Sequence, residues 1–115
     1  MTIQELGTML HYGFPVKIII LNNSFLGMVR QWQEMFFSRR YASTELVNPD
    51  FVTIAKGYNI PAKKVTDRNE LKNSLEEMIN ARGPFLLEIQ IDKEANVLPM
   101  VEPGASVSDV TLTYK

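Results

Sequence analysis

Hydrophobic residues recur along the chain at two different spacings, and these spacings predict its secondary structure. Some segments carry an apolar residue every three or four positions, which is typical of helices with one buried face. Others are short, nearly unbroken apolar runs rich in β-branched residues, which predict strands buried in a parallel sheet. In order, they predict a helix, a strand, two helices, a strand, a helix and a strand, over residues 2–12, 16–21, 27–37, 48–57, 61–65, 67–82 and 85–91.

Capping patterns mark the starts of three predicted helices. The segments Thr2–Glu5 and Asp67–Glu70 match a capping box, in which two side chains satisfy each other's free backbone amides. Asn48 precedes Pro49, which predicts Asn48 as an N-cap and the proline as the first helical residue. In the helix predicted over 27–37, the larger apolar side chains share one face, which predicts a stripe packed against the core: Met28, Trp32, Met35 and Phe36.

Strands that alternate with helices predict an α/β fold, a three-layer α/β/α arrangement around a parallel sheet with right-handed crossovers. A sheet of three strands is narrow, and a helix rather than a strand comes first, so we expect part of a larger domain. Residues 93–115 have no regular period and contain Pro99, Pro103 and Gly104, which indicates an extended C-terminal arm. The expected organisation is therefore a domain part over residues 1–92 followed by that arm.

The composition is that of an ordinary globular domain, and it argues against several kinds of function. Of the 115 residues, 45% are hydrophobic and 22% are charged, and the net charge of −1 argues against a nucleic-acid partner. The lack of cysteine excludes disulfides, zinc–cysteine sites and thiol nucleophiles, and it fits a cytoplasmic location. No apolar run approaches the length of a membrane span, so we expect no membrane partner.

The end of the strand predicted over 16–21 is the most promising place for chemistry. Ligands of open parallel sheets bind beyond the carboxyl ends of strands, and here the strand leads into Asn22 and Asn23, with Gly27 opening the next helix. Asparagine side-chain oxygens suit Mg²⁺, and the free amides of a helix N-terminus suit a phosphate. A magnesium–diphosphate ligand would use both, although a simple polar turn and helix cap explain the same residues.

Other enzyme classes find little support among the residues. His11 is the only histidine, and its position near the end of the first predicted helix favours an interaction with the helix dipole. Neither a G-x-S-x-G nucleophile elbow nor a G-x-x-x-x-G-K-[ST] phosphate loop occurs in the sequence. We therefore expect no catalytic side chain within this chain.

The stretch Lys17–Trp32, KIIILNNSFLGMVRQW, resembles the acetolactate synthase (acetohydroxyacid synthase) catalytic subunits, whose strand, loop and helix read L-N-N-x-x-x-G-M-V-x-Q-W. The double asparagine also closes the general thiamine diphosphate motif, which opens with Gly-Asp-Gly earlier in such chains. The resemblance extends along nearly the whole chain, through residues 1–6, 46–51, 83–93 and 97–101. It implies the C-terminal part of a thiamine diphosphate-binding domain.

The resemblance implies roles for five residues. Asn23 matches the family's Mg²⁺ ligand through its side-chain oxygen, and Phe25 matches a position that offers its backbone carbonyl to the same ion. Together with these two, Gly27 and Met28 match positions against the thiamine diphosphate cofactor. Met28 and Trp32 match the wall of the substrate pocket, where the tryptophan favours 2-oxobutanoate as second substrate. FAD, where a complete enzyme carries it, would lie outside this segment.

The implied activity adds the hydroxyethyl unit left on the cofactor after decarboxylation of pyruvate to a second 2-oxo acid, pyruvate or 2-oxobutanoate, in branched-chain amino-acid biosynthesis. Two parts of the family's site are missing: the Asp of Gly-Asp-Gly, which also binds Mg²⁺, and an activating glutamate from a second subunit. We therefore expect the isolated chain to be inactive. Its expected partners are the N-terminal part of the same subunit and further copies in a homo-oligomer, which leaves room for a regulatory subunit.

Two alternatives to this function stay open. The chain could be a non-catalytic binding or oligomerisation module that associates through its sheet edge and apolar helices. It could also belong to another thiamine diphosphate-dependent 2-oxo acid decarboxylase or oxidase. The Gln31–Trp32 pair argues against the latter by resemblance alone.

Overall fold

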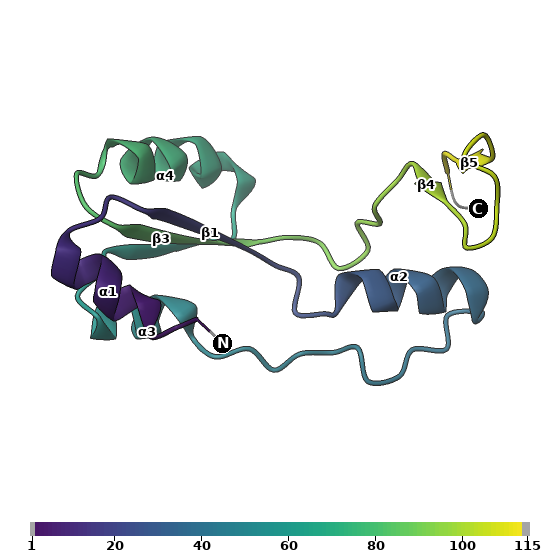
Figure 1. The fold of residues 1–115 in the computed structure, drawn as a ribbon, viewed down its shortest axis with the longest axis horizontal. Helices are drawn as coiled ribbons and strands as arrows, with labels where there is room; N and C mark the ends of the chain where they lie inside the picture. Colours follow the sequence, from purple (N-terminus) through teal and green to yellow (C-terminus); the bar gives the residue numbers. More distant parts are fainter. Residues whose placement is uncertain (1, 114–115) are drawn as a thin grey trace. The chain divides into compact units, whose positions relative to one another are not determined.

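The computed structural model describes residues 2–113, and its first seven helices and strands follow the predicted order (Figure 1). Within that range the elements are α1 (Glu5–Tyr12), β1 (Lys17–Asn22), α2 (Gly27–Phe36), α3 (Phe51–Gly57), β2 (Ala62–Val65), α4 (Arg68–Asn80), β3 (Phe85–Gln90), β4 (Met100–Val101) and β5 (Val110–Thr111). The two short strands β4 and β5 pair in an antiparallel manner within the segment that was expected to be an extended arm.

The chain forms two compact units. The sheet unit comprises the residues up to Asn23 together with Asn48–Ile91. The α2 unit comprises Ser24–Val47 and the chain from Asp92 onward. The division expected at residue 92, between a domain part and an arm, stays a prediction.

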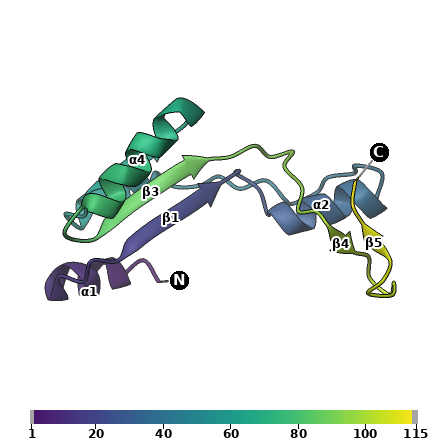
Figure 2. The same ribbon diagram turned by 90° about the horizontal axis from the view of Figure 1, so that it is seen from above.

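The sheet unit is built around three parallel strands in the order β1-β3-β2. In the register of this sheet, Ile20 of β1 and Lys64 of β2 both lie opposite Glu88 of β3. Figure 2 shows β1 and β3 running in the same direction. Helices α1 and α3 lie on one face of the sheet and α4 lies on the other (Figure 1). The predicted three-layer α/β/α fold is therefore confirmed.

Strand β3 separates two hydrophobic cores, because neighbouring residues of a strand point to opposite faces of the sheet. Leu86 packs with Leu6 of α1 and Ala55 of α3 on one face. Leu87 is fully buried and packs with Met78 of α4 on the other face. As the middle strand with helices on both sides, β3 is the element around which both cores form.

Strand β1 is less buried than the sequence predicts. Its side chains Ile18 and Ile20 pack against the core beneath α1 and α3, but Ile19 and Leu21 on the opposite face are 47% and 63% exposed. Helix α4 packs on β2 and β3, whereas β1 lies at the edge of the sheet. The prediction of a strand covered on both faces is therefore wrong for β1, although its parallel pairing is confirmed.

The predicted capping boxes have different outcomes at α1 and α4. The box at Thr2 and Glu5 is wrong, since the N-cap of α1 is Gln4, whose side chain makes no capping hydrogen bond, and the amide of Glu5 donates to the backbone carbonyl of Thr2 at 3.0 Å. The capping role of Asp67 is confirmed, because its carboxylate accepts a hydrogen bond from the amide of Asn69 at 2.9 Å. A backbone turn therefore starts α1, whereas a side-chain cap starts α4.

Helix α3 begins two residues later than Asn48 and Pro49 predict. Its N-cap is Asp50, whose carboxylate accepts hydrogen bonds from the amide and the hydroxyl of Thr53 at 2.9 and 2.8 Å. These hydrogen bonds stabilise the charged carboxylate and lower the pKa of Asp50, with the Thr53 amide as the largest cause. The capping role predicted for Asn48 is wrong because its side chain donates instead to Asn22, 26 positions away.

Helix α2 buries a different face from the one that its apolar residues predict. Arg30 and Gln31 are 5% and 2% exposed, whereas Met28 and Trp32 are 52% and 40% exposed. The prediction of a core-facing apolar stripe is therefore wrong for α2. The reason lies within the α2 unit, where the partners of the buried side are charged groups, aromatic rings and backbone carbonyls rather than an apolar surface.

Candidate site at the end of strand β1

The first asparagine of the pair, Asn22, ends β1 and is held by a set of buried hydrogen bonds. Its amide nitrogen donates to the Glu88 carboxylate at 2.7 Å, and its side-chain oxygen accepts from Asn48 at 2.9 Å. Its backbone carbonyl accepts from the side chain of Gln90 at 2.8 Å and from the amide of Ile91 at 3.0 Å. Both ends of the side chain and the carbonyl of Asn22 are thus engaged inside the sheet unit.

The second asparagine, Asn23, is half-buried and is the last residue of this part of the sheet unit. Ser24, the first residue of the α2 unit, has a left-handed backbone with a φ of 60°. Such a conformation is uncommon outside glycine and bends the chain sharply after the strand. The two predicted Mg²⁺ ligands, Asn23 and Phe25, lie on either side of this residue and belong to different units.

The chain after Ser24 pairs with the loop of residues 38–47, which connects α2 to α3. Phe25 forms an antiparallel bridge with Glu45. The amide of Leu26 donates to the carbonyl of Thr44 at 2.8 Å, and an amide of the same loop donates to the carbonyl of Ser24 at 2.8 Å. These contacts fix the backbone around Phe25.

The N-terminus of α2 has features that suit an anion. Leu26 precedes the helix and has no polar side-chain atom with which to cap the first amides, and no acidic residue lies in the first turn. Gly27 and Met28 open the helix and are exposed. Free amides at a helix start and the positive end of the helix dipole both attract phosphate groups.

Arg30 is the centre of the α2 unit, and its role was not foreseen from the sequence. Its guanidinium lies 5.2 Å from the ring centroid of Phe25 and 4.5 Å from that of Tyr41. It also lies 2.7 Å from the Glu94 carboxylate and 3.6 Å from that of Glu34. One buried cation therefore joins α2, the turn before it, the 38–47 loop and the C-terminal segment.

Gln31 binds the C-terminal segment to α2. Its side-chain nitrogen donates to the carbonyl of Val97 at 3.0 Å, and its side-chain oxygen accepts from the amide of Val97 at 2.8 Å. These paired hydrogen bonds imitate a strand pairing and give both polar atoms of a buried side-chain amide a partner. The sequence offered no signal for them, because Val97 lies 66 positions from Gln31.

Trp32 lies on the exposed side of α2, where it forms part of an aromatic surface. Its ring meets that of Phe36 edge to face, with the centroids 5.8 Å apart. A shallow cavity of about 370 Å³ opens against these rings, and it is lined by Trp32, Phe36, Phe37, Glu102 and Pro103. The substrate-pocket role predicted for Trp32 stays a prediction, and its exposure leaves the ring accessible to a ligand.

Glu88 is a further residue whose role was not predicted from the sequence. Its side chain is 3% exposed in the middle of β3 and accepts hydrogen bonds from Lys64 at 2.8 Å and from Asn22 at 2.7 Å. A single acidic residue within the apolar strand Phe85–Gln90 was the available signal, because a buried carboxylate needs partners.

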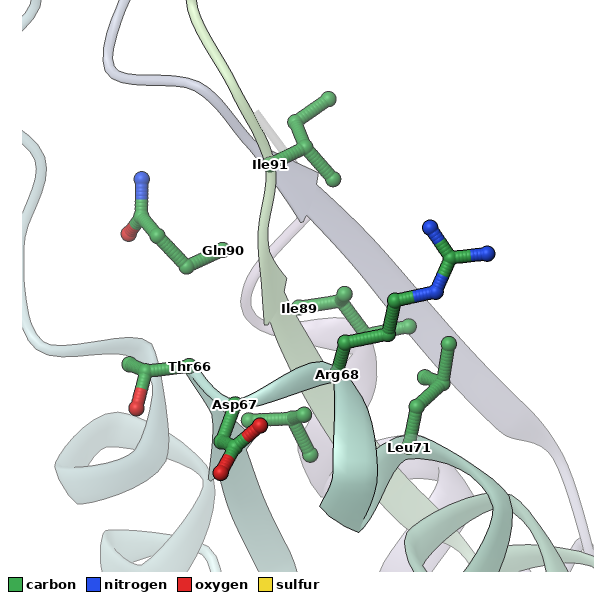
Figure 3. A pocket seen from close by; sticks show the side chains of 8 residues that line it. Thr66, Asp67, Arg68, Leu71, Ile89, Gln90 and Ile91 are labelled. Atoms are coloured by element: carbon green, nitrogen blue, oxygen red, sulfur yellow. The ribbon is translucent and has the colours of Figure 1, made fainter.

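A second hollow lies at the carboxyl ends of β2 and β3, beside the start of α4. It has a volume of about 270 Å³ and is lined by Val65, Thr66, Asp67, Arg68, Leu71, Ile89, Gln90 and Ile91. Figure 3 shows Gln90 on the opposite side of the strand from Ile89 and Ile91. None of the residues predicted to bind a cofactor lines this hollow.

The described part of the chain contains neither a cluster of metal-binding side chains nor a membrane-spanning helix. Between residues 2 and 113, no three His, Cys, Asp or Glu side chains gather in a way that could hold a metal ion. Over the same residues, no helix combines the length and the apolar character needed to cross a membrane.

Comparison with known proteins identifies the family. Residues 1–89 match the family described as thiamine pyrophosphate enzyme, C-terminal TPP binding domain. The chain belongs to this family. Thiamine pyrophosphate is another name for thiamine diphosphate, so the family agrees with the resemblance carried by the double asparagine.

The curated relatives of this chain include subunits of acetolactate synthases. The chain is 45% identical over 111 residues to the acetolactate synthase isozyme 2 large subunit of Escherichia coli, a match that covers 96% of this chain. It is 42% identical over 109 residues to the mitochondrial acetolactate synthase catalytic subunit of Saccharomyces cerevisiae, over 95% of this chain. These matches cover only 20% and 16% of the two relatives.

A solved structure of a thiamine diphosphate enzyme shares the fold. The thiamine diphosphate-dependent 4-hydroxybenzoylformate decarboxylase of Rhodococcus jostii superposes with a TM-score of 0.69 at 27% identity. The superposition covers 78% of this chain and 17% of that protein. In all three matches the chain corresponds to only a small part of a much longer protein.

The residues after β1 fit a magnesium-bound diphosphate in their chemistry. Amide and carbonyl oxygens are hard donors of the kind that Mg²⁺ accepts, and Asn23 and Phe25 supply one of each. The exposed start of α2 supplies amides for an anion. Both features lie in one continuous stretch of chain, from Asn23 to Met28.

Proposed function

We propose that this chain forms the C-terminal part of the catalytic subunit of an acetolactate synthase. The observation that carries the proposal is the similarity to acetolactate synthase subunits of a bacterium and a yeast, at 45% and 42% identity over nearly the whole chain. The complete enzyme would transfer a two-carbon unit from pyruvate to a second 2-oxo acid, in branched-chain amino-acid biosynthesis. Thiamine diphosphate supplies the carbanion chemistry when bound, and the protein binds and orients it.

The proposed contribution of the chain to cofactor binding comes from Asn23 to Met28. Asn23 would bind Mg²⁺ through its side-chain oxygen and Phe25 through its backbone carbonyl. Gly27, which has no Cβ, would allow the diphosphate to approach the backbone, and Met28 would contact the cofactor. Two neutral oxygens hold a strongly hydrated Mg²⁺ weakly, so we infer that a carboxylate from the rest of the enzyme completes the metal site.

Trp32 and Met28 are proposed as the wall of the substrate pocket. Their exposed side chains are supported from behind by Arg30 and Gln31, whose interactions hold α2 within its unit. A large apolar wall can favour a substrate with one more methylene by roughly 1–3 kcal/mol. 2-Oxobutanoate differs from pyruvate by one such methylene.

The open edge of the sheet favours the rest of the same subunit as the main partner of this chain. Among the described residues β1 pairs with β3 along one edge only, and Ile19 and Leu21 expose apolar surface next to the open edge. A further strand and helix would satisfy the open backbone groups and cover these side chains. A homo-oligomer, a regulatory subunit and a cytoplasmic location also belong to this proposal; the last is supported by the cysteine-free composition.

A hybrid enzyme tests the proposal directly. In it, this chain replaces the matched segment of the Escherichia coli acetolactate synthase isozyme 2 large subunit. We expect the hybrid to form acetolactate from pyruvate only with thiamine diphosphate and Mg²⁺, and Asn23→Ala to abolish that activity. The matched control is Asn73→Ala, which removes an exposed amide on α4. A folded hybrid that forms no acetolactate, or an Asn23→Ala hybrid with full activity, would contradict the proposal.

The product also separates the proposed activity from that of a decarboxylase. An acetolactate synthase joins the two-carbon unit to a second 2-oxo acid, whereas a simple decarboxylase releases it as acetaldehyde. We expect acetolactate as the main product of the hybrid and no product from the isolated chain. Acetaldehyde as the main product would favour the decarboxylase alternative.

The open edge of β1 also favours a second candidate, an oligomerisation module without catalysis. In that case the isolated chain would form a defined dimer in which the β1 edges pair. Analytical ultracentrifugation of the isolated chain distinguishes the candidates. A monodisperse dimer together with an inactive hybrid would support the module, whereas an active hybrid supports the synthase.

A further inference from the structure

A continuous chain of polar side chains crosses the sheet unit at the end of β1. Lys64 of β2 donates to Glu88 of β3 at 2.8 Å, Asn22 of β1 donates to the same Glu88 oxygen at 2.7 Å, and Asn48 donates to Asn22 at 2.9 Å. These contacts join all three strands to the segment that leads into α3. The residue that follows Asn22 is Asn23, the proposed Mg²⁺ ligand.

Glu88 holds the central position in this chain of contacts. It lies on the middle strand β3, with Lys64 of β2 opposite on one side and Ile20 of β1 opposite on the other. Its side chain is almost completely buried. A buried carboxylate is costly unless it is paired and hydrogen-bonded, and packing alone would be served by an apolar residue. The carboxylate is instead the acceptor that orients the amide group of Asn22.

The orientation of Asn22 determines how the chain enters Asn23. With the Asn22 side chain anchored at both ends and its carbonyl bound by Gln90 and Ile91, the peptide group between Asn22 and Asn23 has a fixed direction. The Cα of Asn23, and with it the base of its side chain, is therefore set by contacts of its neighbour. Ligand geometry around Mg²⁺ is strict, so such support affects metal affinity.

We propose that Glu88 is a positioning residue for Asn23: through Asn22 it sets the direction from which Asn23 reaches the metal. This inference rests on the proposed function, since it assumes that Asn23 binds Mg²⁺. It separates the roles of the two asparagines, with Asn22 as the anchored residue and Asn23 as the ligand. It also gives Lys64 the role of holding the Glu88 carboxylate in place from the neighbouring strand.

The test measures Mg²⁺ binding to the hybrid enzyme by isothermal titration calorimetry, together with the Mg²⁺ concentration at half-maximal activity, with thiamine diphosphate in excess. Glu88→Leu leaves the Asn22 amide without this acceptor, and we expect the half-maximal Mg²⁺ concentration to rise severalfold. Loss of a group bonded directly to a metal ligand costs about 10- to 100-fold, and Glu88 acts one residue further away. Glu88→Gln keeps an oxygen acceptor for Asn22, and we expect it to restore most of the Mg²⁺ affinity. Glu77→Leu, at an exposed glutamate paired with Lys63, is the matched control and should change nothing.

The outcomes separate this inference from the proposed function. An unmodified hybrid that forms no acetolactate, or whose activity survives Asn23→Ala, defeats the proposed function. If the unmodified hybrid is active and Asn23→Ala abolishes that activity, an unchanged Mg²⁺ requirement in Glu88→Leu overturns the positioning role, even where the melting temperature falls. Should Glu88→Leu fail to fold, Asn48→Ala decides, because it removes only the outer hydrogen bond to Asn22. A severalfold rise in the Mg²⁺ requirement then supports the inference, and an unchanged requirement overturns it.

Discussion

The two compact units bury opposite kinds of side chain. In the sheet unit, apolar side chains from its helices and strands fill two cores, and the polar groups meet at the carboxyl end of the strands. In the α2 unit, Arg30 and Gln31 are buried while Met28 and Trp32 are exposed. An apolar core stabilises by area removed from water, whereas a polar centre stabilises by directed contacts. The second arrangement leaves the apolar side chains of α2 accessible to a ligand.

The largest expected effect comes from the core of the sheet unit. Leu87→Ala removes a fully buried side chain between β3 and α4, and we expect the free energy of unfolding to fall by about 2–5 kcal/mol. Urea denaturation followed by circular dichroism measures this change. Ile79→Ala, at a position 66% exposed on α4, is the control and should stay within about 0.5 kcal/mol. Equal losses for both variants would mean that α4 does not cover the sheet as described.

A smaller and local effect is expected from the centre of the α2 unit. Arg30→Met removes the cation beside Phe25, Tyr41 and Glu94, and we expect a loss of about 1–3 kcal/mol that is confined to this unit. Hydrogen exchange should become faster in α2 and stay unchanged in β3. Arg39→Met, at an exposed arginine, provides the control. Faster exchange in both units would show that they unfold together.

Trp32 should matter little for stability and much for substrate choice. Because its ring is partly exposed, Trp32→Leu should lower the free energy of unfolding by less than about 1 kcal/mol. In the hybrid enzyme, we expect the preference for 2-oxobutanoate over pyruvate to fall roughly 10- to 200-fold. Competition between the two substrates, with both products quantified, measures the ratio. An unchanged ratio would remove Trp32 from the proposed pocket.

The smallest effect is expected at the surface of the sheet unit and depends on pH. The pKa of Asp50 is lowered by the Thr53 amide, so the folded state binds this proton less readily than the unfolded chain does. Its contribution is complete above the ordinary value of 3.8 and is lost as the pH falls through the lower folded value. Asp50→Asn keeps a capping oxygen, so urea midpoints at pH 7 and pH 3 should differ less for this variant. An identical difference in both proteins would show that the cap does not titrate.

The sequence predicted the elements that depend on local patterns. The apolar run before Asn22 became β1, Asp67 became the cap of α4, and Gly57 ended α3. Each of these outcomes depends on residues within one or two turns, and local backbone preferences are readable over such distances. The family was also readable, because the string from Leu21 to Trp32 carries it.

Only the tertiary structure decided which side chains are buried and which partners they contact. Asn48 forms a hydrogen bond with Asn22 rather than capping a helix, because the fold brings together residues 26 positions apart. Glu88 is central because β3 lies between β1 and β2, an order that no single strand encodes. Arg30 is buried because charged and aromatic partners from distant segments gather around it. Burial and polar pairing depend on neighbours far away in the sequence, so they follow from the packed structure and not from the local pattern.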